Sequence, residues 1–209
     1  MTKSTHPRRL YILHKLPTPY MDDLFRAIHA SEDMDVQVYH LWKGSGRRPW
    51  KVELGTGYPN RYMNARFGID LKAVRSALMD RNSLFLVADW AHLPTIVPLV
   101  CRLLVRAPVA LWVDTPQEQL SRPFLKRVLR NVFLRRLLRS VTFIFGSGEP
   151  AARALRSMGA PREKILDYQL VVDADRPVKM AKDPAVVEQA QALRRQVGCA
   201  DADQGSGVR

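Results

Sequence analysis

"LYILHKLPTPYMDDLFRAI", residues 10–28, joins a short apolar run to a segment with the features of a helix start. Thr18 can cap this helix, and Pro19 fits its first position because its ring fixes a helical φ. Two acids in the first turn favour the helix dipole: Asp22 and Asp23. Three apolar side chains share one face of the predicted helix: Leu24, Phe25 and Ile28. The stretch therefore predicts a strand followed directly by an amphipathic helix.

The same alternation continues along the chain. Four further apolar runs have the length of strands: residues 36–42, 84–88, 109–113 and 141–145. Asp70 can cap a helix with three inward side chains: Leu71, Val74 and Leu78. Pro94 can open another with three: Val97, Val100 and Leu104. A helix after Ser147 would end at Gly159, because glycine suits the left-handed turn after a helix. Residues 47–58 fit a strand or a loop.

Strands that are apolar on both faces and alternate with helices predict an α/β fold, a Rossmann-like doubly wound parallel sheet with helices on both faces. The pattern occupies residues 1–176, which we expect to form one domain. Residues 177–209 are expected to add one helix, opened by Pro184 and closed by Gly198, and then a flexible polar tail.

The composition excludes several classes of protein. A chain of 209 residues with 46% hydrophobic content can bury one sizeable core. Its two cysteines, Cys101 and Cys199, offer neither a disulfide framework nor metal-ligand spacing, so we expect a reduced, cytoplasmic setting. The longest apolar stretch, residues 93–105, is interrupted by Arg102 and is shorter than the roughly 20 residues of a membrane span. The sequence thus predicts a protein that is soluble or lies on a membrane surface.

Ligands of parallel sheets bind beyond the carboxyl ends of the strands, so the residues that follow each apolar run form the candidate site. The first run leads into residues 14–20, and the chain has no G-x-G-x-x-G and no Walker A sequence to hold a nucleotide in the usual way. Five residues of interest follow the later runs: Asp89, His92, Asp114, Gly146 and Ser147. A base and two carboxylates that converge on one crevice can bind hydroxyl groups.

Each of these residues also has a simpler interpretation. Asp89 and Asp114 can cap the helices that follow them, and His92 can be only a residue at a helix start. The glycines around Ser147 can relieve a tight turn between strand and helix, although amides there can also bind an anion or a sugar hydroxyl. The residues alone leave both interpretations open.

The positive charge is concentrated in one region. Residues 121–180 contain 13 lysines and arginines against 5 acids, and so carry +8 of the net charge of +13. Residues 121–140 are predicted to form a helix whose first half has an apolar arc: Phe124, Leu125, Val128, Leu129 and Val132. Three basic residues lie opposite this arc: Lys126, Arg127 and Arg130. In the second half of the helix the apolar and the basic residues exchange sides.

In that second half, apolar residues take the formerly basic side: Leu134, Leu137, Leu138 and Val141. Basic residues take the formerly apolar side: Arg135, Arg136 and Arg139. A straight helix cannot bury both arcs against one surface, so either it bends near Phe133–Leu134 or the outward arc contacts a missing domain or a bilayer. A basic surface with an apolar edge is what an interfacial membrane contact needs.

The positive charge is also compatible with a solvated helix or with nucleic acid. A solvated helix face would use its arginine stems to cover apolar surface. A pI near 10.3 fits nucleic-acid binding, although no RNP-like, zinc or compact helix-turn-helix pattern accompanies it. The charge pattern alone therefore leaves three roles open for residues 121–140.

Four segments occur in the order found in a known enzyme family. They are "PTPYMDDLFRAI" (17–28), "RRPW" (47–50), residues 122–165 and "VVDAD" (171–175). In the later segments a basic helix, a strand ending in glycine, a helix, G-x-P-x-x-K-I and V-D follow one another. Over residues 8–176 the chain resembles the N-terminal half of retaining GT-B glycosyltransferases of the family 4-like group.

The resemblance implies a domain that binds the acceptor, opposite a second domain that binds a sugar nucleotide as co-substrate, with no other cofactor and no metal. It implies hexosyl transfer to a membrane-bound or polysaccharide acceptor, in polysaccharide biosynthesis, by a cytoplasmic protein peripheral on the inner face of the membrane. His92 would contact the reacting sugar. The acceptor-binding residues would be Tyr20, Asp89, Asp114, Gly146 and Ser147. The basic side chains of residues 121–140 would meet an anionic membrane surface.

Two features depart from the family pattern. Pro17, Thr18 and Pro19 replace a glycine-rich first turn and stiffen the loop. The spaced pair of glutamates of the donor-binding half is absent, so by resemblance the chain is half an enzyme, inactive without a donor-binding domain in cis or in trans. The alternatives are a non-catalytic remnant, a subunit of a split enzyme, and a basic nucleic-acid-binding α/β domain.

Overall fold

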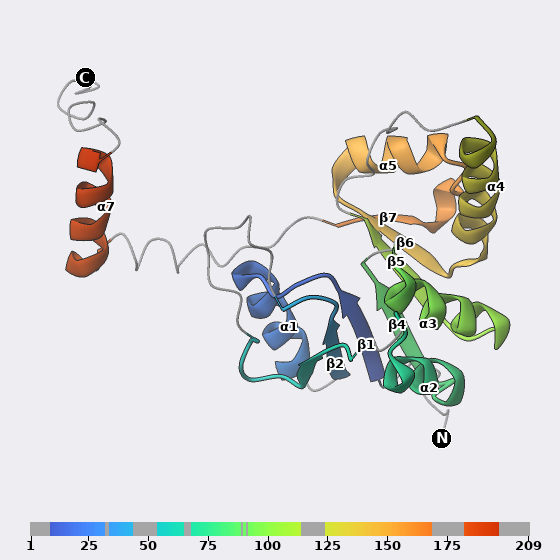
Figure 1. Ribbon diagram of the computed structural model, residues 1–209, viewed down its shortest axis with the longest axis horizontal. Helices are drawn as coiled ribbons and strands as arrows, with labels where there is room; N and C mark the ends of the chain where they lie inside the picture. The colour runs from blue at the N-terminus through green and yellow to red at the C-terminus, as the bar shows by residue number, and fades with distance from the viewer. Residues whose placement is uncertain are drawn as a thin grey trace. The chain divides into compact units, whose positions relative to one another are not determined.

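The computed structural model describes residues 9–31, 34–43, 54–64, 68–88, 90, 92–113, 124–168 and 182–196. The chain divides into two compact units, residues 1–171 and 172–209. In the described part of the first unit the strands form one seven-stranded sheet (Figure 1). The second unit contains the helix α7 (Pro184–Gln196), which begins at the proline predicted to open it.

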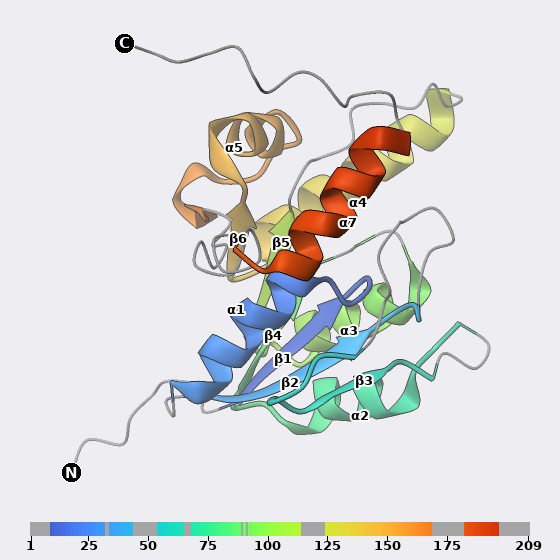
Figure 2. The ribbon, with the colours of Figure 1, turned by 90° about the vertical axis from the view of Figure 1, so that its left-hand side faces the viewer.

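All seven strands are parallel, in the order β3-β2-β1-β4-β5-β6-β7. Figure 2 shows β3, β2, β1 and β4 side by side in this order. The strands are β1 (Arg9–His14), β2 (Asp35–His40), β3 (Asn60–Tyr62), β4 (Ser83–Val87), β5 (Val109–Val113), β6 (Phe143–Gly146) and β7 (Ile165–Asp167). The helices of this unit are α1 (Pro19–Ala30), α2 (Leu71–Met79), α3 (Leu93–Leu104), α4 (Phe124–Ser140) and α5 (Gly148–Ser157), with a 3₁₀ turn η1 (Arg162–Lys164). The predicted doubly wound α/β fold is confirmed.

Two strands were not predicted. β3 follows the segment 47–58 that fitted a strand or a loop, and most of that segment lies outside the described residues. β7 has only three residues and pairs with β6 through Ile165 and its two successors. Such short edge strands carry too few residues for an alternating pattern to be recognised.

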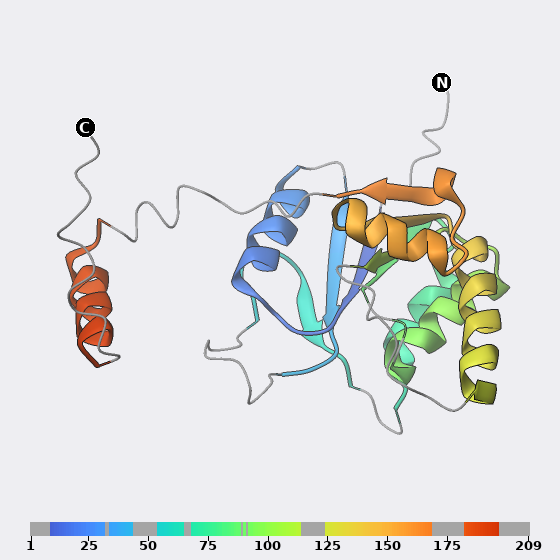
Figure 3. The ribbon, with the colours of Figure 1, turned by 90° about the horizontal axis from the view of Figure 1, so that it is seen from above.

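The sheet has a core on each face because successive strand side chains point to opposite sides. Leu10 and Ile12 of β1 pack with Phe25 of α1, whereas Tyr11 and Leu13 pack into a larger core that also holds buried residues of α2, α3, α4 and α5. Figure 3 shows α1 on one side of the central strands and α2 and α3 on the other. The predicted apolar face of α1 is confirmed, with Phe25 fully buried and Leu24 and Ile28 packed against the same core.

The inward faces predicted for the next two helices are wrong in part. In α2 the buried residues are Ala73 and Ala77, while Leu71 is exposed. In α3 the fully buried side chains include Leu99 and Arg102, and Leu104 is exposed. The large apolar residues Leu71 and Leu104 therefore lie at the rim, and close packing of α2 favours its small side chains at the contact.

The predicted helix caps differ in their outcome. Asp70 caps α2 as predicted, because its Oδ1 accepts a hydrogen bond from the Ala73 amide at 2.8 Å. Thr18 stands at the N-cap of α1, but its side chain makes no capping hydrogen bond. Its buried hydroxyl has no hydrogen-bond partner among the described residues. Gly159 follows the end of α5 as predicted, with a φ of +95° that favours glycine.

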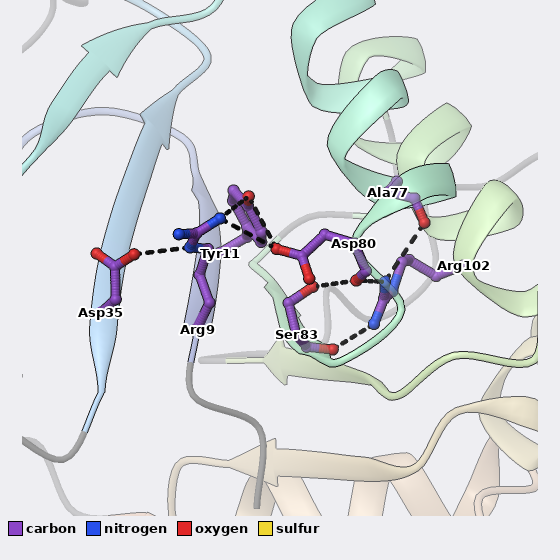
Figure 4. A network of polar contacts seen from close by, with 7 residues as sticks. All are labelled: Arg9, Tyr11, Asp35, Ala77, Asp80, Ser83 and Arg102. Carbon is purple, nitrogen blue, oxygen red and sulfur yellow. Dashed lines mark hydrogen bonds and ion pairs between the residues drawn. The ribbon is translucent and has the colours of Figure 1, made fainter.

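The amino ends of the central strands are fastened by arginines (Figure 4). Arg9 donates to Asp35 at 2.7 Å and to Asp80 at 3.3 Å, which links β1 to β2 and to the residue after α2. The fully buried Arg102 donates to the carbonyl of Asp80 at 2.7 Å and also to that of Ser83. The side chains of Arg9 and Arg102 at this edge therefore hold neighbouring elements of the sheet together.

Among the described residues, none of the helices combines the length and the apolar character that crossing a bilayer requires.

Candidate functional site

The opposite edge, at the carboxyl ends of the strands, gathers rings from several segments. His14 ends β1 and His40 ends β2, and their ring centroids lie 5.9 Å apart in an edge-to-face arrangement. Phe25 of α1 lies 5.8 Å from His14 and 6.4 Å from His40. Trp112 of β5 completes the group at 6.1 Å from His14. These residues lie on the face of the sheet that α1 covers.

His40 is fully buried, and neither of its ring nitrogens has a hydrogen-bond partner within the described part of the chain. Burial, with a smaller contribution from the charge of nearby His14, lowers the pKa of His40 to about 3. The ring is therefore neutral at physiological pH. The indole N–H of Trp112 is also buried with no partner in the described ranges. Buried polar groups without hydrogen-bond partners are uncommon in stable folds. Their concentration here therefore identifies this edge as the candidate functional site.

His92 lies at the same edge, at the start of α3. It is the N-cap residue, and its carbonyl accepts hydrogen bonds from the amides of Thr95 and Ile96 at 3.0 and 2.9 Å. Its side chain makes no capping hydrogen bond. The imidazole instead packs edge to face on Trp42, with centroids 4.8 Å apart. The helix start therefore depends on the backbone of His92 and not on its ring.

The glycine turn after β6 is less open than the sequence suggested. Gly146 is buried, and a Cβ there would lie 3.2 Å from Leu155 Cδ1, so this glycine allows α5 to approach the strand. The amide of Gly148 donates to Asp167 Oδ1 at 2.8 Å, which occupies a donor that an anion would need. Ser147 is half-buried at the N-cap of α5. Tyr20, at the start of α1, packs partly buried against the core under that helix.

Several of the predicted site residues have no described position. Asp89 and Asp114 lie outside the described residues, as do the side chains of Lys126, Arg127 and Arg130. Within the described ranges, no group of three histidine, cysteine, aspartate or glutamate side chains is arranged to hold a metal ion.

The second half of α4 turns its apolar arc toward the core, an orientation that the sequence left open. Its apolar side chains are buried against the sheet: Leu134, Leu137, Leu138 and Val141. Its basic residues face outward: Arg135, Arg136 and Arg139. Val132, the last member of the first apolar arc, is 64% exposed, and Phe133 is 46% exposed. The outward side of α4 therefore combines arginines with exposed apolar surface.

The sequence patterns did not single out His14, His40 or Trp42. All three stand at or just beyond the carboxyl ends of β1 and β2, where ligand-binding residues of parallel sheets are found. Glycine-rich phosphate loops are the usual motif at these positions, and this chain has rings there instead. An aromatic or imidazole ring at a strand end is the signal that could have found them.

Comparison with known proteins finds similar structures but no similar sequence. No protein-family model matches the chain, and no curated protein matches its sequence. The structure is similar to crystal structures of HepE from Anabaena, in complex with UDP-glucose and with UDP and glucose, each at a TM-score of 0.53 and 13% identity. A third HepE structure, in complex with UDP, has a TM-score of 0.50 and 10% identity.

In each comparison 92% of this chain is covered, and it spans about half of the HepE chain, 50%, 51% and 50% respectively. Likeness at this level of identity concerns the fold alone. The chain has a Rossmann-like α/β fold, similar to that of about half of the HepE chain.

Proposed function

We propose that this chain is the acceptor-binding half of a retaining GT-B glycosyltransferase. The enzyme would transfer a hexosyl group from a sugar nucleotide to a membrane-bound or polysaccharide acceptor. The observation that carries the proposal is the likeness of 92% of this chain to half of HepE, whose crystal structures contain UDP-glucose or UDP. The ring-rich carboxyl edge, with His92 packed on Trp42, supports it because ligands of parallel sheets bind there.

In this proposal His92 is the residue that contacts the reacting sugar. A neutral or protonated imidazole can hold a hydroxyl group or move its proton. Five further residues would bind the acceptor around it: Tyr20, Asp89, Asp114, Gly146 and Ser147. The leaving phosphate would be stabilised by basic and amide groups of a donor-binding half, in cis or in trans, with no metal required.

Transfer assays test the proposal. The chain joined to a donor-binding half is expected to transfer radiolabelled sugar to lipid acceptor extracts, and His92→Ala is expected to lower turnover by about 10²-fold or more, the range for a positioned proton-transfer group. The 209-residue chain alone is expected to give no product, because the donor contacts belong to the other half.

Val97→Ala, on α3 beside the same helix start, serves as the matched control and should keep turnover within about threefold. A His92→Ala enzyme as active as the parent would reduce His92 to a helix-start residue. Robust turnover by the isolated chain would contradict the division into two halves. Failure of the joined protein to use any sugar nucleotide would favour a non-catalytic remnant.

The same proposal includes a membrane contact through α4, on the cytoplasmic face. Arg135, Arg136 and Arg139 face outward on the side where Val132 and Phe133 are exposed. Basic side chains contribute roughly 1 kcal/mol each near anionic lipid, and adjacent apolar groups can enter the interface. The overlap of both features on one side of α4 supports a peripheral membrane protein.

Vesicle sedimentation tests this contact. The chain is expected to sediment with vesicles that contain anionic lipid and not with neutral ones, and less so as salt rises. Changing Arg135, Arg136 and Arg139 together to Gln should weaken binding at least about tenfold, because three attractions of this size are lost. Changing Lys126, Arg127 and Arg130 together should matter far less, since the phase exchange places them on the other side of the helix.

Equal loss from both triple variants would indicate diffuse electrostatics in place of an oriented helix. A parent chain that ignores anionic vesicles but binds DNA with a steep salt dependence would contradict the membrane contact and favour nucleic acid.

A further inference from the structure

Trp42 is a large aromatic residue whose backbone is hydrogen-bonded at the carboxyl edge. Its backbone amide donates to the carbonyl of Lys15 at 2.9 Å, and the amide of Leu41 donates to that of His14 at the same distance. These hydrogen bonds continue the pairing of β1 and β2 beyond the last strand residue. The backbone position from which the indole projects is therefore fixed by hydrogen bonds, as a binding surface requires.

Trp42 nevertheless remains 38% exposed. It meets His92 edge to face, with an interplanar angle of 86°. In such a pair one ring presents its edge to the face of the other. Whichever ring presents its face, His92 covers at most one face of the Trp42 indole. Part of the Trp42 side chain therefore stays exposed to solvent beside the imidazole of His92.

This combination suits one class of ligand. A pyranose has a face of C–H groups that needs apolar surface and a rim of hydroxyl groups that needs hydrogen-bond partners, and binding sites pair the two kinds of contact. A neighbouring cation, Lys43, has its Nζ 5.9 Å above the ring of Tyr62, so its charge is directed to that ring. Stacking and hydrogen bonds are therefore the contacts that we expect a ligand to make with Trp42 and His92.

We propose that Trp42 is the stacking surface for a neutral pyranose of the acceptor, with His92 beside it as the partner of a ring hydroxyl. The inference rests on the proposed function, since it identifies what the acceptor site takes. It adds a specificity-determining residue and a substrate class, an uncharged sugar ring in place of a phosphorylated or acidic one.

The test uses the 209-residue chain itself. Methyl glycosides of glucose, galactose, mannose and N-acetylglucosamine are titrated at millimolar concentrations, and binding is followed by tryptophan fluorescence and by amide NMR shifts. Trp42→Ala is expected to weaken the binding of at least one glycoside about tenfold, or about 1.4 kcal/mol. Trp42→Phe keeps an aromatic face and should lose less.

Phe143→Ala is the matched control, because Phe143 is an exposed aromatic residue of similar exposure, 41%, at the amino end of β6. It should leave glycoside binding unchanged. Three results would overturn the inference: no glycoside binds the parent chain, Trp42→Ala binds as the parent does, or Trp42→Ala loses vesicle binding instead. Preference of the parent for glucose 1-phosphate over methyl glucoside would also overturn it, as charge would then dominate.

The two proposals fail separately. If the joined enzyme transfers sugar and depends on His92, but Trp42→Ala leaves the acceptor KM unchanged, the stacking role is wrong and the function stands. If glycosides bind through Trp42 and no transfer is found, the sugar site stands and the transferase proposal fails.

Discussion

Replacing Arg102 with methionine is expected to lower the free energy of unfolding by about 1.5–3 kcal/mol, the range for losing hydrogen bonds between a charged donor and neutral acceptors. The guanidinium donates to the carbonyls of Ala77, Asp80 and Ser83 and, at 3.0 Å, to that of Pro108. It also lies over the ring of Phe85, 4.7 Å from the centroid. Methionine fills similar space but removes these hydrogen bonds, although the carbonyls of Asp80 and Pro108 keep donors from Ser83 and from the Phe85 amide.

Burial lowers the pKa of Arg102 to about 10, with Asp80 acting in the opposite direction. The side chain therefore stays charged at neutral pH. Its hydrogen bonds to the surrounding carbonyls offset the free energy lost by burying the charge. Urea unfolding at pH 7 measures the loss. Arg75→Met, at an exposed position of α2, is the matched control and should change stability by less than about 0.5 kcal/mol. An Arg102→Met chain as stable as the control would mean that the carbonyls find other donors.

A second large effect is expected from His40 as the pH falls. Because burial lowers its pKa to about 3 from the usual value of 6.5, the unfolded chain takes up a proton between these values and the folded chain does not. The contribution of His40 to stability is then complete above pH 6.5 and falls as the pH decreases toward 3. At about 1.4 kcal/mol per pH unit, the parent should lose roughly 2–3 kcal/mol between about pH 6.5 and pH 4.5 through this residue.

His40→Phe should remove this part of the pH dependence, and His40→Gln should remove it too, because neither side chain titrates. At pH 7 His40→Phe should be at least as stable as the parent, since two unsatisfied nitrogens are replaced by an apolar ring. Urea unfolding at several pH values measures both effects. If the parent and His40→Phe lose equal stability down to pH 4.5, His40 is protonated in the fold and the burial argument fails.

The buried carboxylate of Asp70 titrates below this acid range. Burial raises the pKa of Asp70, but hydrogen bonds from Arg61 and from the amides of Ala73 and Asn64 outweigh it, so the pKa is lowered from its usual value of 3.8. Its stabilising contribution is therefore present above about pH 3.8 and is lost only at lower pH. The loss expected from His40 down to pH 4.5 does not include it.

The order of strands and helices could be predicted from the sequence because each element has a local signal. The run at residues 109–113 is apolar on both faces, and it forms β5 with the same bounds. Asp70 and Gly159 marked a helix start and a helix end, where capping and a left-handed turn depend on one residue. The periodicity of Leu134, Leu137 and Leu138 identified an apolar arc in the second half of α4, but left open whether this arc or that of the first half faces the sheet; the structure buries these three leucines.

The candidate site was less predictable. His92 was identified from its position after a strand, and its place at the start of α3 follows from the sequence. Its contact with Trp42, fifty residues earlier, depends on β1 lying between β2 and β4. His14 and His40 become neighbours because β1 and β2 pair, and nothing local in either segment indicates it.

The sequence by itself determined the alternation of strands and helices, their approximate bounds and the excess of positive charge, because periodicity, capping and composition are local properties. Only the tertiary structure decided that Ala73 and Ala77 face the sheet while Leu71 does not, and that Arg102 is buried among carbonyls. Only the fold brought His14, His40, Trp42 and His92 to one edge. The physical reason is that burial and ring contacts depend on which strands become neighbours, and strand order is a property of the whole sheet.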